Sequence, residues 1–420
     1  MLVEFRVANY GSIRDEQVLS MVATKAKEHL DTNTFESGAK GVPRLLRSVL
    51  IYGPNASGKS TLVSALQFMK GFVLDSSTKM REGDRIDLVP FLLDPASAAK
   101  PSTFEVTIVV EGVRYQYGFS ADQRRVHAEW LLAFPEGRPR QLLRRDFDSE
   151  KEEDWEIRLR GKKSDWKVQT KSNSLFLSTA VQLNSEQLRP IYNWFRESIG
   201  TIFHLHPNFT TRQCFEDNAM NASVLSMMAS ADISIDEIKT HKRPFSKDVL
   251  TKTLPDAIKE YFIGEYDGKE MIEVKFGHRG ADGSKVFFDP MSESVGTRVL
   301  FDLAGPWLDS LSKGITVVVD EINNSLHPHV VHMLVGMFHN AEINKSNAQL
   351  IATTHETSLM SREFIRRDQI VLVEKDENSA TRVYALSDFS PRKQESIENG
   401  YLQGRYGAVP IIGRPEPPHG

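Results

Sequence analysis

The sequence predicts an α/β fold, a mixed β-sheet flanked by helices, and three observations point to it. A strand at 48–52 leads through a glycine-rich loop into a helix at 61–69. An apolar, β-branched run at 315–319 has the composition of a buried parallel strand. A third strand at 349–355 follows it after a helix at 330–341, which is the interval of a βαβ unit. The carboxyl ends of these strands are therefore expected to meet at one edge of the sheet.

The glycine-rich loop fits the pattern G-x-x-x-x-G-K-[ST] and has the strand–loop–helix context that this pattern requires. Its backbone N–H groups and the helix N-terminus would face a phosphate. Lys59 would reach the β- and γ-phosphates, and the Ser60 hydroxyl would ligate Mg²⁺. The loop is made of Gly53, Pro54, Asn55, Ala56, Ser57, Gly58, Lys59, Ser60 and Thr61. The alternative, a chance match, is much weaker because the context also fits.

Two acids follow the strand at 315–319, at the edge where open α/β sheets place their ligands. Asp320 would hold Mg²⁺ through its water shell. Glu321 would orient the water that attacks the γ-phosphate, or accept its proton. Taken alone, the pair could also be surface acids at a strand end. The phosphate loop favours the functional interpretation.

Two further sites are expected. The strand at 349–355 ends at His355, which would lie at the same sheet edge, although a lone histidine is more often structural. Ser294, Gly296 and Thr297 lie in a small polar cluster that opens a helix at 298–304, a second place where an anion could bind. The alternative is that this cluster is a plain helix N-cap.

The rest of the chain divides by pattern into five segments. Residues 1–135 hold the phosphate loop and an antiparallel β subdomain, with strands at 104–110, 113–119 and 130–134. Residues 136–172 are a charged β/loop segment, with weaker strand signals at 141–143 and 155–157; solvated surface is favoured over a nucleic-acid patch. Residues 173–265 are expected to be an inserted helical lobe, with helical spacing at 188–195, 224–228, 233–238 and 256–262. Residues 266–390 complete the head, starting with strands at 271–276 and 285–288, and 391–420 form a C-terminal tail.

Composition sets further limits. The 420 residues carry a net charge of −4 and a single cysteine, so a disulfide framework is excluded and a reducing compartment fits. The N-terminus shows no secretory signal, and no apolar run approaches the length of a membrane span. We therefore expect a cytoplasmic protein without membrane contact.

The order of these motifs resembles a P-loop NTPase of the ABC-ATPase type, a head of the Rad50/SMC/RecF/OLD branch. More closely, the chain is similar to the bacterial AAA-15/AAA-21 (RloA/AbiL-like) family of abortive-infection ATPases. The resemblance covers nearly the whole chain. Besides the motifs above, it rests on Phe5 to Ile13, Ser325 to Pro328, Thr353 to Leu359 and Gly400 to Pro410.

The resemblance implies a role for each motif. The loop of residues 53–61 is the Walker A loop for ATP, Asp320 and Glu321 are the Walker B pair, and His355 is the switch histidine. Ser294, Gly296 and Thr297 are the signature that binds ATP held by another protomer, and residues 324–327 stand where the family places its D-loop. The signature lacks the second glycine and trailing glutamine of transporters, Val295 replaces an acid found in relatives, and no Q-loop glutamine is placed. Hydrolysis of ATP to ADP and phosphate would accompany a homodimer or a larger homo-oligomer.

Three functions follow from the resemblance and the missing pieces. The favoured one is a sensor or regulatory ATPase of an anti-phage system with a separate effector, a nuclease or toxin. The sequence at 371–374 superficially resembles the opening of a Toprim nuclease, but no Asp-x-Asp follows it, and a hairpin with its turn at 376–379 is predicted instead. The alternatives are a RecF/Rad50-like DNA-repair or DNA-end-binding ATPase, which would bind nucleic acid, and a nucleotide-gated scaffold with little turnover. Effector and oligomer contacts are expected on the lobe and on the tail.

Overall fold

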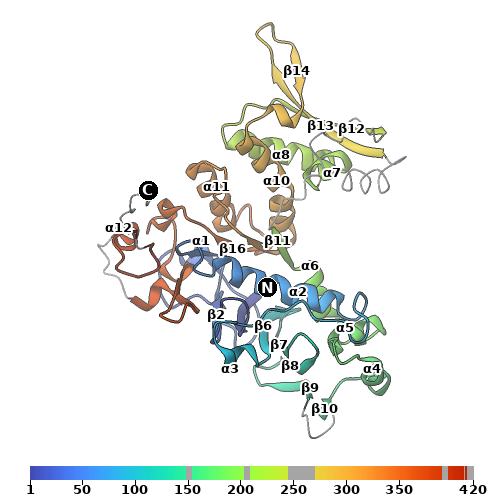
Figure 1. The fold of residues 1–420 in the computed structure, drawn as a ribbon. Helices are drawn as coiled ribbons and strands as arrows, with labels where there is room; N and C mark the ends of the chain where they lie inside the picture. The colour runs from blue at the N-terminus through green and yellow to red at the C-terminus, as the bar shows by residue number, and fades with distance from the viewer. Residues whose placement is uncertain (148–153, 203–208, 245–269, 390–395, 411, 414–420) are drawn as a thin grey trace, which may run out of the picture. The chain divides into compact units, whose positions relative to one another are not determined.

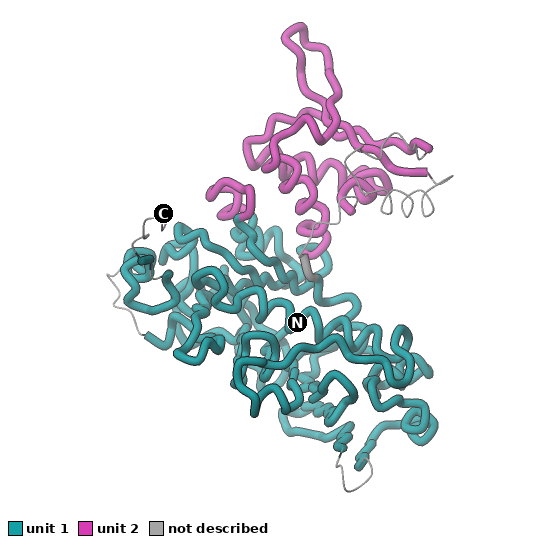
Figure 2. Tube along the Cα trace, in the orientation of Figure 1, with its two compact units in different colours: residues 1–203, 311–323, 334–420 teal, residues 204–310, 324–333 magenta. Residues whose placement is uncertain are grey.

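The computed structural model describes residues 1–147, 154–202, 209–244, 270–389, 396–410 and 412–413 (Figure 1). The chain forms two compact units (Figure 2). The first unit comprises Met1–Phe203, Leu311–Asn323 and Leu334–Gly420, and the second comprises His204–Ser310 and Asn324–Met333. Each unit is described by itself below. Among the described residues, no helix has the length and apolar character needed to cross a membrane.

The first unit contains the mixed sheet that the sequence predicts. Its six strands lie in the order β11-β15-β16-β5-β17-β18, and all neighbours are parallel except the last pair. The strands are β11 (Ile199–Ile202), β15 (Thr316–Val319), β16 (Gln349–Thr353), β5 (Ser48–Tyr52), β17 (Ile370–Lys375) and β18 (Thr381–Ala385). The β17–β18 hairpin confirms the prediction made for the segment around 371–374. Every residue of β5, β15 and β16 is buried, as expected of parallel strands covered on both faces.

A seven-stranded antiparallel sheet forms the other half of the first unit. Its order is β10-β9-β8-β7-β6-β1-β2. The strands are β10 (Asp154–Ile157), β9 (Arg140–Asp146), β8 (Val126–Phe134), β7 (Val113–Ala121), β6 (Ser102–Val110), β1 (Leu2–Ala8) and β2 (Gln17–Ser20). The predicted β6–β7 hairpin is present, with left-handed backbone at both residues of its two-residue turn, Glu111 and Gly112. The charged segment at 136–172 supplies the two strands at one edge of this sheet.

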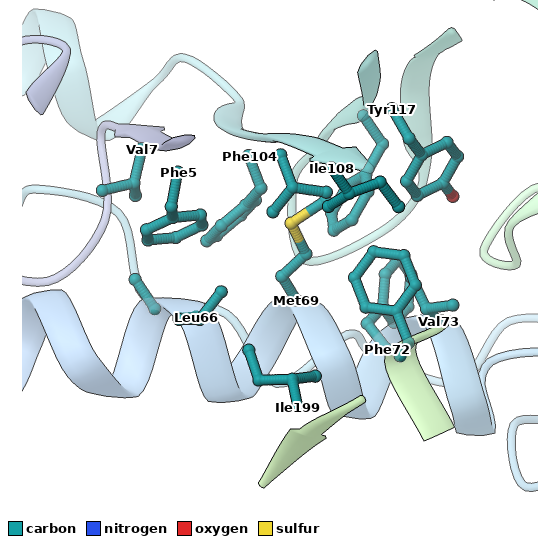
Figure 3. Close-up of a cluster of buried hydrophobic side chains, with 14 of the residues drawn as sticks. Phe5, Val7, Leu66, Met69, Phe72, Val73, Phe104, Ile108, Tyr117 and Ile199 are labelled. Atoms are coloured by element: carbon teal, nitrogen blue, oxygen red, sulfur yellow. The ribbon is translucent and has the colours of Figure 1, made fainter. Parts of the chain in front are cut away.

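Helix α2 (Lys59–Asp75) packs against this antiparallel sheet (Figure 3). Its side chains Leu66, Met69, Phe72 and Val73 face apolar side chains of the sheet, while Ile199 of β11 lies on the other side of the helix. The facing sheet residues in this view are Phe5, Val7, Phe104, Ile108 and Tyr117. The helix that begins at the phosphate loop is thus anchored by one continuous hydrophobic core, which fixes where the loop sits.

The boundary predicted for the inserted lobe, 173–265, was wrong at its first residue. Helices α5 (Phe176–Gln182) and α6 (Arg189–Glu197) bury Phe176, Ile191 and Phe195 in the core of the first unit. The second unit begins only at His204. Helical spacing correctly identified these amphipathic segments, but a periodic pattern does not say which core its apolar face joins. The short helices α1 (Leu30–Asn33), α3 (Pro95–Ala98) and α4 (Lys163–Gln169) and the strand pair β3 (Thr34–Phe35) and β4 (Leu45–Leu46) complete this part.

The second unit contains a sheet as well as helices. Its elements are α7 (Phe209–Glu216), α8 (Asn218–Ser230), β12 (Glu237–Pro244), β13 (Glu270–Arg279), β14 (Lys285–Phe288), most of α10 (Val295–Lys313) and the start of α11 (Pro328–His339). The helix predicted at 233–238 is wrong, because residues 233–236 form neither helix nor strand, and β12, which pairs with β13, begins at Glu237. A short β-branched stretch does not separate strand from helix by period alone. The strands predicted at 271–276 and 285–288 are present, but they belong to this unit rather than to the head. The helix predicted at 256–262 lies outside the described residues.

The C-terminal segment is docked on the first unit up to Ala408. Helix α12 (Ile397–Leu402) buries Tyr401, whose ring meets Tyr52 of β5 at 5.9 Å between centroids. The Tyr401 hydroxyl donates to the Ala408 carbonyl at 2.9 Å, and the Ala408 N–H donates to Glu374 Oε2 at 2.9 Å. These contacts hold the tail against the first unit over this stretch. Farther on, the side chain of Ile412 is 87% exposed.

Candidate nucleotide-binding site

The phosphate loop joins β5 to α2 and is closely approached by the β17–β18 hairpin. A Cβ atom on Gly53 would lie 2.1 Å from the Val373 carbonyl oxygen, and one on Gly58 would lie 2.1 Å from Thr381 Oγ1. Gly58 also has a φ of 110°, a backbone conformation that residues with a Cβ atom rarely adopt. The two glycines of the motif are therefore required by the space around the loop as well as by its backbone.

Lys59, the first residue of α2, is buried and points back over the loop. Its Nζ donates to the Gly53 carbonyl at 2.8 Å and to the Pro54 carbonyl at 3.1 Å. Burial lowers the pKa of Lys59, while the nearby carboxylates of Asp320 and Glu321 oppose that shift. The ammonium group of Lys59 thus lies among the carbonyl groups of the loop and close to the carboxylates of Asp320 and Glu321.

Two hydroxyls of the loop suit a phosphate and its cation. Ser57 is 2% exposed, and its Oγ is buried without a hydrogen-bond partner among the described residues. An unpaired buried hydroxyl is costly, and a ligand that accepts or donates there would remove the cost. Ser60, in contrast, is exposed at the start of α2, where a ligand can reach it. The loop therefore fits a phosphate group with a bound Mg²⁺.

The two acids after β15 are held by Thr353 at the end of β16. The Thr353 hydroxyl donates to Asp320 Oδ1 at 2.5 Å and accepts the Glu321 N–H at 2.7 Å. Glu321 has a φ of 55°, unusual for a residue with a side chain, and its side chain is exposed. The neighbouring strand thus fixes the backbone of Glu321 while its carboxylate stays open to solvent.

His355 is positioned by its backbone and by Asn323. Asn323 Oδ1 accepts the His355 N–H at 3.1 Å and the Thr354 hydroxyl at 3.0 Å. Burial lowers the pKa of His355, the Lys59 charge lowers it further, and Glu321 opposes the shift. The imidazole is therefore favoured in its neutral form. Lys59, Asp320, Glu321 and His355, which the sequence placed on three separate strand ends, are close enough to act on one another electrostatically.

The predicted signature residues form a group of their own in the second unit. Ser294 Oγ accepts the Thr297 N–H at 3.1 Å and lies 2.8 Å from Thr297 Oγ1. This is the hydrogen bond of a helix N-cap, which was the alternative interpretation from sequence. A Cβ atom on Gly296 would lie 2.9 Å from the Ser325 carbonyl oxygen, so that glycine lets the helix end approach the predicted D-loop.

Sequence reasoning missed four residues that hold the site together. They are Ser12, Asn323, Thr353 and Thr381, and each binds its neighbours through a side-chain hydroxyl or amide. For Asn323 and Thr353 a signal existed, because both are polar residues at strand ends that also carry Asp320, Glu321 or His355. Ser12 lies within the stretch from Phe5 to Ile13 that carries the family resemblance, but nothing in that stretch indicated a contact with the loop. For Thr381 there was no signal, since it lies far from the loop in sequence.

The parallel sheet with its phosphate loop, together with the antiparallel sheet packed on α2, defines an ABC-type ATPase head of the P-loop class. Comparison with protein families matches residues 48–361 to the family described as "AAA domain, putative AbiEii toxin, Type IV TA system". The chain belongs to this family. A search of curated proteins found no match.

Solved structures similar to this chain include heads of SMC proteins and RecF. The SMC head bound to the C-terminal winged-helix domain of ScpA is 14% identical, covers 95% of this chain and 99% of that chain, and has a TM-score of 0.47. The SMC head with an extended coiled coil, bound to the C-terminal domain of ScpA from Pyrococcus furiosus, is 12% identical, with coverages of 96% and 98% and a TM-score of 0.40. The recombination mediator RecF is 13% identical, with coverages of 92% and 98% and a TM-score of 0.35. At these values the likenesses carry no argument about function.

Proposed function

We propose that this chain is an ATPase that serves as the sensor or regulatory scaffold of a bacterial anti-phage, abortive-infection-like system and acts with a separate effector protein. The observation that carries the ATPase part is the convergence of Lys59, Asp320, Glu321 and His355 beside a loop with an unpaired buried hydroxyl. A buried hydroxyl without a partner, beside charged side chains that are partly open to solvent, is expected of a site that bonds to a ligand.

Each residue has a chemical task in this proposal. The loop N–H groups and Lys59 Nζ bind the phosphates, with Lys59 exchanging its two loop carbonyls for phosphate oxygens. Ser60 and Asp320 would hold Mg²⁺, which would offset the negative charge of the phosphates. ATP supplies the phosphoanhydride bond whose hydrolysis releases free energy. The Glu321 carboxylate takes the proton of the attacking water, and the neutral imidazole of His355 contacts the γ-phosphate.

The signature would act in trans. Ser294, Gly296 and Thr297 of a second protomer cover the ATP bound at Lys59, so that ATP joins two heads into a homodimer or a larger homo-oligomer. This step rests on the resemblance and on the exposed N-terminal end of α10, where Val295 is 53% exposed. Hydrolysis would release the two heads.

A separate effector is supported by the family and by the state of Glu374. The family description names an AbiEii toxin and a type IV toxin–antitoxin system, which supports a role beside a second protein. Glu374, the acid that could open a nuclease motif, instead accepts the N–H of Ala408 and lies within a hairpin. We propose that the effector binds the second unit, whose β12 carries the exposed residues Lys239 and Lys242.

The test measures turnover and association with one preparation. Purified chain is expected to hydrolyse Mg-ATP, and a pull-down from its native host is expected to capture a nuclease or toxin. Lys239→Glu with Lys242→Glu should abolish capture and phage protection while sparing turnover. If turnover falls in step with protection, the second unit belongs to the catalytic machinery. Turnover that depends on added DNA, with no effector captured, would favour the RecF/Rad50-like alternative. ATP binding without turnover would favour a nucleotide-gated scaffold.

A further inference from the structure

Thr381, the first residue of β18, lies against the phosphate loop although 320 or more residues separate it from that loop in sequence. It is 1% exposed, and three polar groups surround its Oγ1. Ser57 O lies at 2.9 Å, Ser12 Oγ at 2.8 Å and Lys375 Nζ at 3.2 Å. A hydroxyl has one proton to donate and two lone pairs to accept with, so all of its capacity is used here.

The direction of each bond follows from the partners. A carbonyl oxygen can only accept, and a lysine ammonium can only donate. Thr381 therefore donates its single proton to Ser57 O and accepts from Lys375 Nζ. The Ser12 hydroxyl lies 2.8 Å from Thr381 Oγ1 and 3.1 Å from Thr61 Oγ1, so its one proton serves these two threonine oxygens. The proton of the Thr381 hydroxyl is thus used in the hydrogen bond to the carbonyl oxygen of Ser57, in the phosphate loop.

This bond fixes the orientation of a peptide unit that a phosphate would meet. In a trans peptide, the C=O of one residue and the N–H of the next point in opposite directions. With Ser57 O turned toward Thr381, the Gly58 N–H is turned away from Thr381. Gly58 has no side chain to oppose a flip and already has a φ of 110°, so its own conformational preference does not hold this orientation.

We propose that Thr381 is a positioning residue that holds the Ser57–Gly58 peptide with its N–H facing the bound phosphate. The inference rests on the proposed ATP site and adds to it a residue outside every recognised motif. Without the Thr381 hydroxyl, the peptide can turn its carbonyl oxygen toward the phosphate, replacing an attractive donor with a repulsive acceptor.

Thr381 is itself held rigidly, as a positioning residue must be. Its N–H donates to Ser12 O at 2.8 Å. The hairpin turn before it is closed by Asp376 Oδ1, which accepts the N–H groups of Asn378 and Ala380, both at 2.9 Å. Arg14 lies 3.5 Å from the same carboxylate. The loop is thus arranged before the ligand arrives, which reduces the ordering cost of binding.

Two substitutions separate the hydroxyl from the shape of the side chain. Thr381→Val keeps the shape and removes the hydroxyl, whereas Thr381→Ser keeps the hydroxyl and removes the methyl group. We expect Thr381→Val to bind Mg-ATP about ten- to a hundredfold more weakly, the scale for losing one hydrogen bond to a charged group. Thr381→Ser should bind within about threefold of wild type, because serine keeps the hydroxyl that bonds to Ser57 O. The methyl group that it lacks would not contact the phosphate. Affinity is measured by titration with a fluorescent ATP analogue and by competition with ATP.

The matched control is Thr179→Val, which removes a buried hydroxyl that donates to the Leu175 carbonyl at 3.1 Å within α5. It should leave the affinity for Mg-ATP unchanged. Wild-type affinity in Thr381→Val overturns the inference. So does a greater loss in Thr381→Ser than in Thr381→Val, since that order means that packing matters and the hydroxyl does not. If wild-type protein and Lys59→Ala bind Mg-ATP equally poorly, the proposed ATP site itself has failed, and the inference falls with it.

Discussion

The polar side chains at the two ends of the strands of the six-stranded sheet, here called its carboxyl edge and its amino edge, differ in their hydrogen bonding. At the carboxyl edge, Ser57 Oγ has no partner among the described residues, Glu321 has a left-handed backbone, and Ser60 is open to solvent. At the amino edge, Ser48, His339 and Gln369 are buried and bonded to one another. Both edges are rich in polar side chains, but Ser48, His339 and Gln369 bond to one another, whereas the Ser57 hydroxyl and the exposed Ser60 and Glu321 can bond to a ligand.

The amino edge is a closed network. Gln369 Nε2 donates to Ser48 Oγ at 2.7 Å and lies 3.2 Å from His339 Nε2, while Ser48 Oγ lies 2.8 Å from that same nitrogen. Gln369 Nε2 also donates to the Ser48 carbonyl at 3.1 Å, so its two protons serve three neighbouring acceptors, and burial lowers the pKa of His339 so that its ring is neutral. Beside it, Arg366 and Asp368 form a buried ion pair at 2.6 Å, with further bonds to backbone groups. A saturated network of this kind supports the fold.

The comparison teaches that polar composition alone does not locate a function. A buried hydroxyl without a partner, such as that of Ser57, indicates a site when exposed and charged side chains from other strand ends lie close to it. The comparison also predicts that substitutions at the two edges change different properties of the protein. Changes at the carboxyl edge should alter ligand binding or turnover with little effect on stability. Changes at the amino edge should alter stability and leave binding unchanged.

Lys59→Ala should have the largest effect, the loss of productive ATP binding and of turnover. The lysine is the mobile cation of the loop, and removing it leaves the phosphates without their charge-assisted bond, at a cost of about a hundredfold or more in affinity. The measurement is the affinity for Mg-ATP by titration. Lys70→Ala is the control, because Lys70 lies on the same helix and donates to the Ile199 carbonyl at 2.6 Å. Affinity in Lys59→Ala within a factor of two of wild type would refute the assignment.

Glu321→Gln should stop hydrolysis while ATP still binds. The amide keeps the shape of the side chain but cannot take a proton, and loss of a general base lowers rates by about 10²- to 10⁴-fold. Trapped ATP should hold two heads together, so light scattering with ATP should show a larger, longer-lived assembly than wild type. Glu342→Gln, an exposed acid in the segment before β16, is the control. Turnover at the wild-type rate in Glu321→Gln would place the base elsewhere.

The contrast between edges also explains what could be predicted from the sequence. Lys59, Asp320, Glu321 and His355 were placed correctly at one edge, because parallel strands joined by helices have their carboxyl ends together. Thr381 could not be placed, since its role depends on a hairpin folding back against the loop, a contact that no local pattern encodes. The closed network of Ser48, His339 and Gln369 was invisible for the same reason.

For the second unit, the sequence predicted most of the segments but not which unit each segment belongs to. Its segments were largely found, but 173–203 was assigned to it and 270–310 was not. The sequence patterns of helices such as α6 and strands such as β13 predict that one face is buried. They do not predict which of the two hydrophobic cores that face joins. The helix predicted at 233–238 overlaps the start of β12, a strand that went unpredicted because its partner, β13, lies more than twenty residues away along the chain. Pairing between distant segments, rather than local propensity, decided both cases.

Lowering the pH should weaken the amino edge before it affects the carboxyl edge. Burial lowers the pKa of His339 to about 3, so the folded state keeps this ring neutral while the unfolded chain takes up a proton near pH 6.5. The unfolded state then binds more protons between these two values, and stability falls as pH drops through this window. Between pH 6.5 and 5 the loss from this group is about 2 kcal/mol. Urea unfolding at both pH values measures it.

His339→Gln is the variant that isolates this contribution, because Gln can still accept through its amide oxygen but does not titrate. It should lose most of the stability difference between the two pH values and keep wild-type affinity for Mg-ATP. An unchanged pH dependence would mean that other groups cause it. A fall in affinity would mean that the two edges are not independent.

The smallest expected effect extends the comparison to the second unit. The hydroxyl of Ser294 is bonded to Thr297, so in its hydrogen bonding it resembles the amino edge, whereas the proposed ATP sandwich gives it a functional role. Ser294→Ala removes the N-cap and should cost about 1 kcal/mol of stability. Ser294→Asp keeps an equally good cap but adds a negative charge where the sandwich would bring a phosphate of the other protomer. In the Glu321→Gln background, we expect Ser294→Asp to fold with wild-type stability and to lose the assembly that ATP induces, as seen by light scattering. Normal assembly would show that Ser294 only caps α10, and the rule drawn from the sheet edges would then hold in the second unit as well.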